Sequence, residues 1–231
     1  ILEGEGAAAK GELSRSTLSR HLKSMGLSTK DLKASYEMGT ASRRFVRNGR
    51  NTLWQGDIKY GPYIPGTNGR KKRTYLIAFI DDATRLVVHG EFYDNQRLPI
   101  LEDCIRKAIL KYGKPDSIYV DNGKIFVSKW FRVACAKLGI KLMNTKCYSA
   151  QSKGKIERYN GTVNEFMQEI SLEKIKDLNE LNQKFRIWMD EGYNNNPHSS
   201  LDENTPTQAY SKDHKKVSLA GHPESSSLPE L

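Results

Sequence analysis

The sequence predicts a mixed α/β fold, a five-stranded sheet with helices on both faces. Three segments, 52–60, 74–80 and 85–93, come first and have the composition of strands. Two further short strands, 117–120 and 140–144, alternate with amphipathic helices. The second segment, TYLIAFI, is a nearly continuous apolar run, which is typical of a strand at the centre of a sheet.

The helices follow from apolar residues at helical spacing. One helix is expected to begin at Leu98 and to end at Gly113, since glycine commonly terminates helices. Three more helices are expected at 128–138, 153–171 and 177–190. The segment 61–73, GPYIPGTNGRKKR, is rich in Gly and Pro and is expected to form a long polar turn. The three tryptophans are expected in the core: Trp54, Trp130 and Trp188.

A short amphipathic helix is expected ahead of this fold, within residues 13–27 (LSRSTLSRHLKSMGL). Apolar side chains fall on one helical side, and basic or hydroxylic ones largely elsewhere. The second group comprises Arg15, Thr17, Arg20 and Lys23. This pattern fits the second helix of a helix-turn-helix, although any small amphipathic helix has a similar pattern. We expect residues 1–39 to be a helix-turn-helix DNA-binding region, truncated because the chain starts without Met.

The charge distribution points to a polyanionic partner. The chain carries 37 basic and 27 acidic residues, a net charge of +10. Residues 40–73 are the most basic stretch, and Asp57 is its only acid. The bases there are Arg43, Arg44, Arg47, Arg50, Lys59, Arg70, Lys71, Lys72 and Arg73. Such a basic stripe favours binding to a DNA backbone. The alternative is a linker and loop that are simply exposed to solvent. We expect 40–50 to be a basic linker whose Arg43, Arg44 and Arg47 contact DNA, and 211–231 to be a polar tail.

Other classes of protein are disfavoured by composition. No run approaches the roughly 18 apolar residues of a membrane span. The three cysteines form no CxxC pair, which argues against a zinc module and suits a reducing compartment. We therefore expect a cytoplasmic protein.

Three acids occupy special places in the expected fold. Asp57 lies inside the first strand, Asp121 ends the fourth, and Glu157 lies early in a late helix. Ligand sites of open α/β sheets gather at the carboxyl ends of strands, so neighbouring first and fourth strands would bring Asp57 and Asp121 together. A charge buried in a strand is costly unless it is paired or binds a metal. The pattern indicates a cation site.

The motifs around these acids resemble those of the D,D,E integrase and transposase family. WQGDIKY is similar to the family's first-strand motif, YVDNGKIF to its DNG motif and SKGKIERYNGTVNEF to its glutamate-helix motif. Thirty-five residues separate Asp121 from Glu157 (157 − 121 − 1), the D,D(35)E spacing of retroviral integrases and many insertion-sequence transposases. The resemblance covers about 51–210 and includes the ending YNNNPHSSLDENTPTQAY. Because the chain has the expected helix-turn-helix and no zinc module, the resemblance is greatest to bacterial insertion-sequence transposases.

The resemblance implies a ribonuclease H-like catalytic core and a function. Asp57, Asp121 and Glu157 would be the catalytic, metal-binding triad, holding two Mg²⁺ ions about 3.5–4 Å apart, with Mn²⁺ as an alternative. The activity would be transposon-end cleavage and strand transfer by a nucleoid-associated bacterial enzyme. Its partners would be transposon ends, target DNA and further copies of the chain, with a helper ATPase also considered. The DNA contacts near the glutamate would be Tyr148, Gln151, Lys153 and Lys155.

Two alternatives remain at this point. A ribonuclease H-type nuclease takes a glutamate from the helix after the third strand, where Glu102 and Asp103 lie. A catalytically inactive, domesticated DNA-binding protein is the other, although all three acids are present.

Overall fold

The computed structural model describes residues 14–25, 28, 49–66, 70–145, 154–215 and 217. The chain divides into two compact units, Ile1–Phe45 and Val46–Leu231. In the first unit the described helix is α1, Arg15–Ser24; its Leu22 is exposed, and so is Met25, which follows it. One helix does not establish a helix-turn-helix, which therefore stays a prediction.

The second unit contains the predicted five-stranded sheet, in the order β3-β2-β1-β4-β5. The strands are β1 (Trp54–Pro65), β2 (Lys71–Asp81), β3 (Val87–Tyr93), β4 (Ser117–Val120) and β5 (Lys141–Asn144). The first three form an antiparallel meander, and β4 and β5 add in parallel beside β1. This is the mixed sheet expected from three consecutive strands followed by strand–helix alternation.

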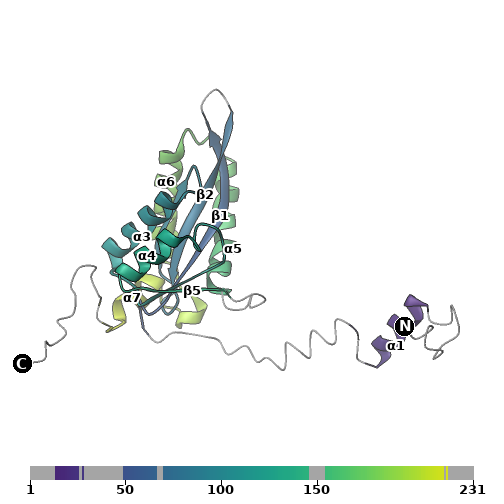
Figure 1. Ribbon diagram of the computed structural model, residues 1–231. Coiled ribbons are helices and arrows are strands. Elements are labelled where there is room, and N and C mark those ends of the chain that lie inside the picture. The colour runs from purple at the N-terminus through teal and green to yellow at the C-terminus, as the bar shows by residue number, and fades with distance from the viewer. Residues whose placement is uncertain are drawn as a thin grey trace, which may run out of the picture. The chain divides into compact units, whose positions relative to one another are not determined.

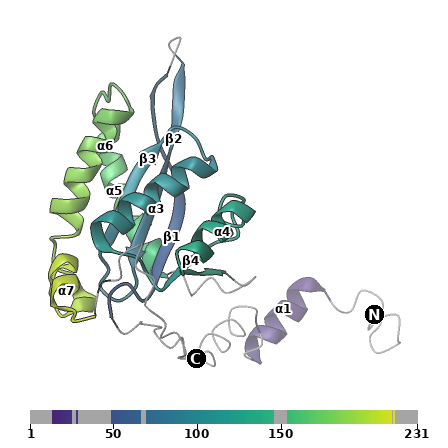
Figure 2. The same ribbon diagram turned by 60° about the vertical axis from the view of Figure 1, so that its left-hand side comes forward.

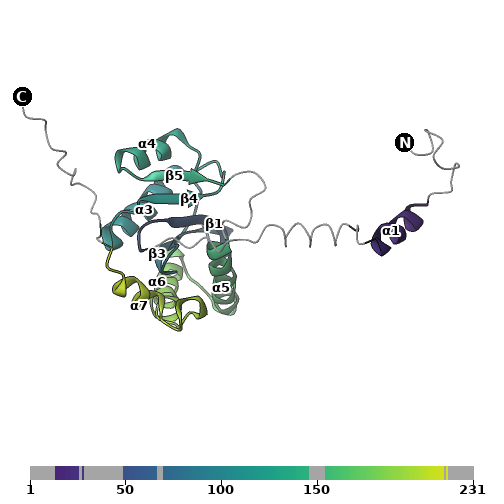
Figure 3. The same ribbon diagram turned by 90° about the horizontal axis from the view of Figure 1, so that it is seen from below.

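Helices cover both faces of the sheet, as Figures 1 and 2 show and as Figure 3 shows from below. They are α3 (Leu98–Tyr112), α4 (Lys129–Lys137), α5 (Gly154–Ser171), α6 (Leu178–Ile187), the π-helix η3 (Trp188–Tyr193), the 3₁₀ turn η4 (Ser199–Leu201) and α7 (Pro206–Lys212). One core lies under α3 and α4 and includes Trp54 and Phe79. The other lies under α5 and α6 and includes Tyr159 and Phe185. Of the helices described, none is both long and apolar enough to cross a membrane.

The predicted turn at 61–73 is wrong. β1 continues to Pro65 and β2 begins at Lys71, so most of this segment extends the hairpin. The strand register shifts between Tyr60 and Tyr63, a bulge that accommodates Gly61 and Pro62 before pairing resumes. Gly and Pro here mark an irregularity within a strand, not its end.

Trp130 also departs from the prediction. Its side chain is 72% exposed on α4, whereas Trp54 is fully buried and Trp188 packs against the second core. Helical spacing identifies an apolar stripe, but its boundary residue can face either the core or solvent.

The outer edge of β3 is covered by two asparagine side chains. Asn182 accepts from the Phe92 N–H (2.8 Å) and donates to its carbonyl (2.9 Å). Asn194 does the same at Val87, over 2.9 and 3.1 Å. The two amides satisfy backbone groups that would otherwise be available for pairing with another strand.

Candidate active site

The parallel pairing of β1 and β4 brings Asp57 and Asp121 together. Gln55 lies opposite Tyr119 in this pair. The same register carried two residues further puts Asp57 opposite Asp121, the first residue after β4. Neighbouring strands are about 4.8 Å apart, and residues opposite one another share a face of the sheet. The expected convergence of these two acids is therefore built into the strand register.

Gly56 explains which way Asp57 points. A Cβ at Gly56 would lie 2.4 Å from Cε1 of Phe79 and 3.0 Å from Cγ1 of Val120, so the backbone packs closely against the first core. Because side chains alternate along a strand, Asp57 faces the opposite side, toward α5. Both Asp57 and Asp121 are half-buried.

A tight turn holds Asp121. The Gly123 N–H donates to Oδ1 of Asp121 over 2.7 Å, and the side chain of Asn144 donates to the Asp121 carbonyl over 3.0 Å. Asn122 donates to the Thr145 carbonyl over 2.9 Å. The turn after β4 is thus tied to β5 and its end, which fixes the carboxylate at the strand terminus.

Helix α5 runs alongside β1, and Glu157 lies in its first turn. The Ile156 N–H donates to Oε1 of Gln55 (3.3 Å), and Nδ2 of Asn160 donates to Oδ2 of Asp57 (2.7 Å). Four helical residues rise about 6 Å, close to the roughly 6.6 Å of two strand residues. Glu157 lies between these two anchors and three residues before Asn160, so the two side chains are neighbours on the helix surface. Glu157 is exposed.

Lys155 is held within the fold. Its Nζ lies 2.6 Å from Oδ2 of Asp82, whose side chain is fully buried, and 3.0 Å from the Asp82 carbonyl oxygen. Nε2 of Gln55 donates to the other carboxylate oxygen over 2.8 Å. Burial lowers the pKa of Lys155, against the opposing effect of Asp82. The charge of Lys155 is paired with Asp82, which disfavours the predicted DNA contact at this residue.

The donor set fits a hard divalent cation, but the three acids are not gathered into a complete coordination shell. Over the described ranges, no group of three or more His, Cys, Asp or Glu side chains could hold a metal ion as the side chains stand. Two carboxylates, one on β1 and one directly after β4, each accept a hydrogen bond from a neutral amide. The third lies on the adjoining helix. Oxygen donors of this kind suit Mg²⁺, which keeps several waters that a phosphate can replace.

The carboxylates that a ribonuclease H-type site would use lie elsewhere. Asp103 accepts from the Tyr93 hydroxyl (3.0 Å) and pairs with Arg106 (2.8 Å) and Lys107 (2.6 Å). It belongs to α3, which packs on the face away from α5, and its neighbour Glu102 is exposed. Neither carboxylate joins Asp57.

The predicted DNA contacts are described only in part. Arg20 and Lys23 are exposed on α1. Arg15 and Thr17 belong to the same helix, but their side chains lie outside the described residues. Also outside them are Arg43, Arg44, Arg47, Tyr148, Gln151 and Lys153.

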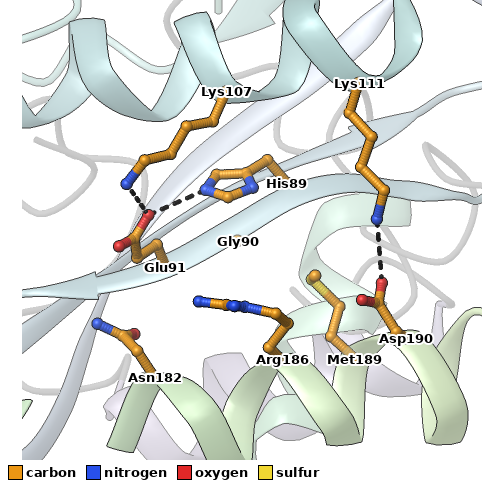
Figure 4. A pocket seen from close by; sticks show the side chains of 9 residues that line it. All are labelled: His89, Gly90, Glu91, Lys107, Lys111, Asn182, Arg186, Met189 and Asp190. Carbon is orange, nitrogen blue, oxygen red and sulfur yellow. Dashed lines mark hydrogen bonds and ion pairs between the residues drawn. The ribbon is translucent and has the colours of Figure 1, made fainter. Parts of the chain in front are cut away.

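A separate polar cavity of about 210 Å³ lies at the edge of β3, between α3 and α6 (Figure 4). Glu91 accepts there from His89 (3.1 Å) and Lys107 (2.6 Å), while Lys111 lies 3.5 Å from Asp190. Its acids are paired with cations, and β3 is two strands away from β1. This cavity is distinct from the place where Asp57 and Asp121 meet.

Sequence reasoning missed Asn160 and the Asp82–Lys155 pair. The spacing of Asn160 to Glu157 is a helical i,i+3 spacing and could have indicated a neighbour of the site. Nothing in the sequence joins Asp82 to Lys155, which lie 73 residues apart and meet only through folding.

Comparison with known proteins gives a family for the second unit. Two family models, both described as integrase core domain, match residues 47–150 and 138–206. The Tn552 transposase of Staphylococcus aureus is 27% identical over 184 residues, 71% of this chain and 38% of its own length. The Gag-Pro-Pol polyprotein of human T-cell leukemia virus 3 (strain Pyl43) is 30% identical over 128 residues, 53% of this chain and 8% of its own length. The chain thus spans well under half of these relatives.

Solved structures show the same fold. The magnesium complex of the HTLV-2 integrase catalytic core, in a trimeric form, aligns with a TM-score of 0.57 and 21% identity, over 71% of this chain and 99% of that one. The intasome of simian T-cell lymphotropic virus, in complex with PP2A regulatory subunit B56 gamma, aligns with a TM-score of 0.57 and 22% identity, over 80% of this chain and 63% of that one. The five-stranded sheet is therefore the ribonuclease H-like fold of these cores, as predicted. Through residues 47–206, the chain belongs to the integrase core domain family.

Proposed function

We propose that the chain is a DNA transposase or integrase that cleaves DNA ends and transfers them to a target by in-line phosphoryl transfer. The observation that supports this most directly is the β1–β4 register, which puts Asp57 opposite Asp121 beside the helix that carries Glu157. The family match supports the same activity, and the ribonuclease H-type and inactive alternatives are not favoured.

In this proposal Asp57, Asp121 and Glu157 hold two Mg²⁺ ions, for which Mn²⁺ can substitute. When bound, such a pair activates a water or 3′-hydroxyl and stabilises the leaving oxygen. The side chains around the acids orient them: Asn160 holds the Asp57 carboxylate, and the Gly123 N–H holds that of Asp121. No protein nucleophile is required, since the attacking group is a water or a DNA hydroxyl.

The proposed substrates are transposon ends and target DNA. Arg20 and Lys23, exposed on α1, would bind the DNA ends as part of a helix-turn-helix within residues 1–39. The linker 40–50 and the segment with Tyr148, Gln151 and Lys153 would add contacts to the core at 51–210. A bacterial, nucleoid-associated location follows from this role.

We also propose that the chain assembles on DNA as a dimer or larger, because two ends must be joined and each core offers one triad. The HTLV-2 core is described in dimeric and trimeric forms, which supports oligomers in this fold. Light scattering on a complex with paired ends tests this, and a strictly monomeric complex would refute it. A helper ATPase is not proposed.

The experiment that tests the activity uses supercoiled plasmid DNA with Mg²⁺ or Mn²⁺. Asp57→Asn and Asp121→Asn should each abolish metal-dependent strand cleavage while the fold remains intact by circular dichroism. Cleavage that survives either substitution would argue against the proposed roles of these carboxylates.

A further inference from the structure

One face of the β1–β2 hairpin combines exposed tyrosines with cations. Tyr63 lies opposite Arg73, and the guanidinium carbon of Arg73 is 4.0 Å from the centre of the Tyr63 ring and 5.6 Å from that of Tyr60. Nη2 of Arg73 also donates to the Tyr63 hydroxyl over 2.7 Å. A guanidinium set between two rings holds both aromatic side chains in a defined arrangement. We call Tyr60, Tyr63, Lys71 and Arg73 the hairpin face, with Arg70 beside it.

The rings of this face are not covered by the described part of the fold. Tyr60 is 64% exposed and Tyr63 is 53% exposed, although both are large aromatic groups. The hairpin strands extend past the helices, as Figures 1 and 2 show. Exposed aromatic groups that are already ordered offer contact area at little cost in conformational entropy.

The charge beside these rings is positive. Arg70 and Lys71 are exposed, and neither forms an ion pair with another described residue. Lys72, on the other face, differs, since its Nζ lies 2.6 Å from Asp94. Aromatic rings interleaved with cations match the chemistry of nucleic acid, in which phosphates alternate with flat bases.

The hairpin face lies on the side of the sheet opposite to the Asp57 side chain, since Tyr60 is three residues from Asp57 and side chains alternate along β1. β4 ends at Val120, so no described strand pairs with the β4 edge of β1 beyond Asp57. This edge of β1 is therefore open beside Tyr60, and the hairpin face is a surface distinct from the place where Asp57 and Asp121 meet.

We propose that the hairpin face binds unpaired DNA. Arg70 and Lys71 bind phosphates, and Tyr60 and Tyr63 stack on unpaired bases. The inference rests on the proposed function and adds to it a second DNA-binding surface, with a preference for DNA that contains an unpaired stretch. Fully paired DNA hides its base faces in the stack and would engage only the cations.

The test measures binding of the full chain by fluorescence anisotropy, in EDTA, to two labelled probes of equal length. One is a fully paired duplex, and the other has an unpaired stretch at one end. The parent chain should prefer the unpaired probe by about tenfold. Tyr60→Leu with Tyr63→Leu should abolish this preference and change duplex affinity little, whereas Tyr60→Phe with Tyr63→Phe should keep it.

The cations have their own variants. Arg70→Ala with Lys71→Ala should weaken binding to both probes and lower the salt slope by about 1.8, because each phosphate contact contributes about 0.9. The matched control is Lys137→Ala with Lys141→Ala, two exposed cations at the opposite end of β5 from the site, and it should leave both affinities nearly unchanged.

The outcomes separate this inference from the proposed function. A leucine variant that retains the preference, or a control pair that weakens binding as much as Arg70 and Lys71, overturns the role of the hairpin face alone. A parent chain that binds neither probe at low salt contradicts the proposed function itself. Melting temperatures of all variants identify any that fail to fold. The variant with Tyr60→Phe and Tyr63→Phe keeps both aromatic rings, and so shows whether the rings cause the preference.

Discussion

The side-chain amide of Asn160 donates to Oδ2 of Asp57 over 2.7 Å, and so connects the helix of Glu157 to the strand of the first acid. A second bond, from the Ile156 N–H to Gln55, fixes the start of the same helix. The spacing of Glu157 from Asp57 is therefore set by two hydrogen bonds and not by the helix packing alone.

Asn160→Ala should lower metal-dependent DNA cleavage about 10- to 100-fold, as loss of outer partners of metal ligands commonly does. In this variant Asp57 would be less well oriented and would bind the ion more weakly. A high Mg²⁺ concentration should therefore reduce the defect. The measurement is cleavage rate against Mg²⁺ concentration. Asn164→Ala, an exposed site on the same helix, is the control, and equal defects in both variants would contradict the role of Asn160.

Lys155→Met should destabilise the fold by about 3–5 kcal/mol, because it leaves the buried Asp82 carboxylate without its cation. Chemical denaturation measures this. Lys184→Met removes a pair of similar length, 2.8 Å from Glu173 but exposed to solvent, and should change the stability little. Similar losses in the two variants would show that the Lys155 pair is no more than a surface contact.

Acid should weaken the fold partly through Glu91. Burial alone would raise the pKa of Glu91, but His89 and Lys107 outweigh it and hold the pKa below the ordinary value of 4.5. A lowered folded-state pKa contributes stability above about pH 4.5 that is lost as the pH falls through the folded value. Glu91→Gln should therefore flatten the pH dependence of the unfolding free energy between about pH 5 and pH 3. A steep slope retained in Glu91→Gln would refute the assignment.

Arg20→Ala with Lys23→Ala should weaken DNA binding and lower its salt slope by about one unit per lost phosphate contact. Both residues are exposed on α1. Anisotropy titrations at several salt concentrations measure the slope, with the Lys137 and Lys141 double variant as the control. Unchanged affinity and slope would remove α1 from the proposed DNA surface.

Much of the fold was predictable because its signals are local. The apolar run of β2 and the Gly113 stop of α3 each lie within one segment. The convergence of Asp57 with Asp121 was predictable too, since carboxyl ends of neighbouring parallel strands meet at one edge.

Other features depend on contacts between distant segments, which local patterns do not contain. The hairpin extension needs Tyr63 to pair with Arg73 across a bulge, although Gly61 and Pro62 in isolation favour a turn. In the sequence, Lys155 has the surroundings of a lysine that faces DNA. Its ion pair with Asp82 forms only through folding. The exposure of Trp130 likewise depends on how α4 is rotated on the sheet.

The central claim is that Glu157 is a metal ligand, and the most direct test compares Glu157→Gln with Glu165→Gln, an exposed site on the same helix. Cleavage of plasmid DNA in Mg²⁺ and the melting temperature are measured on the same preparations. Glu157→Gln should lose several orders of magnitude in rate, because metal and electrostatic effects dominate phosphoryl transfer, and should keep its melting temperature. Glu165→Gln should keep both. A Glu157→Gln variant that cleaves DNA at the parental rate would contradict the account.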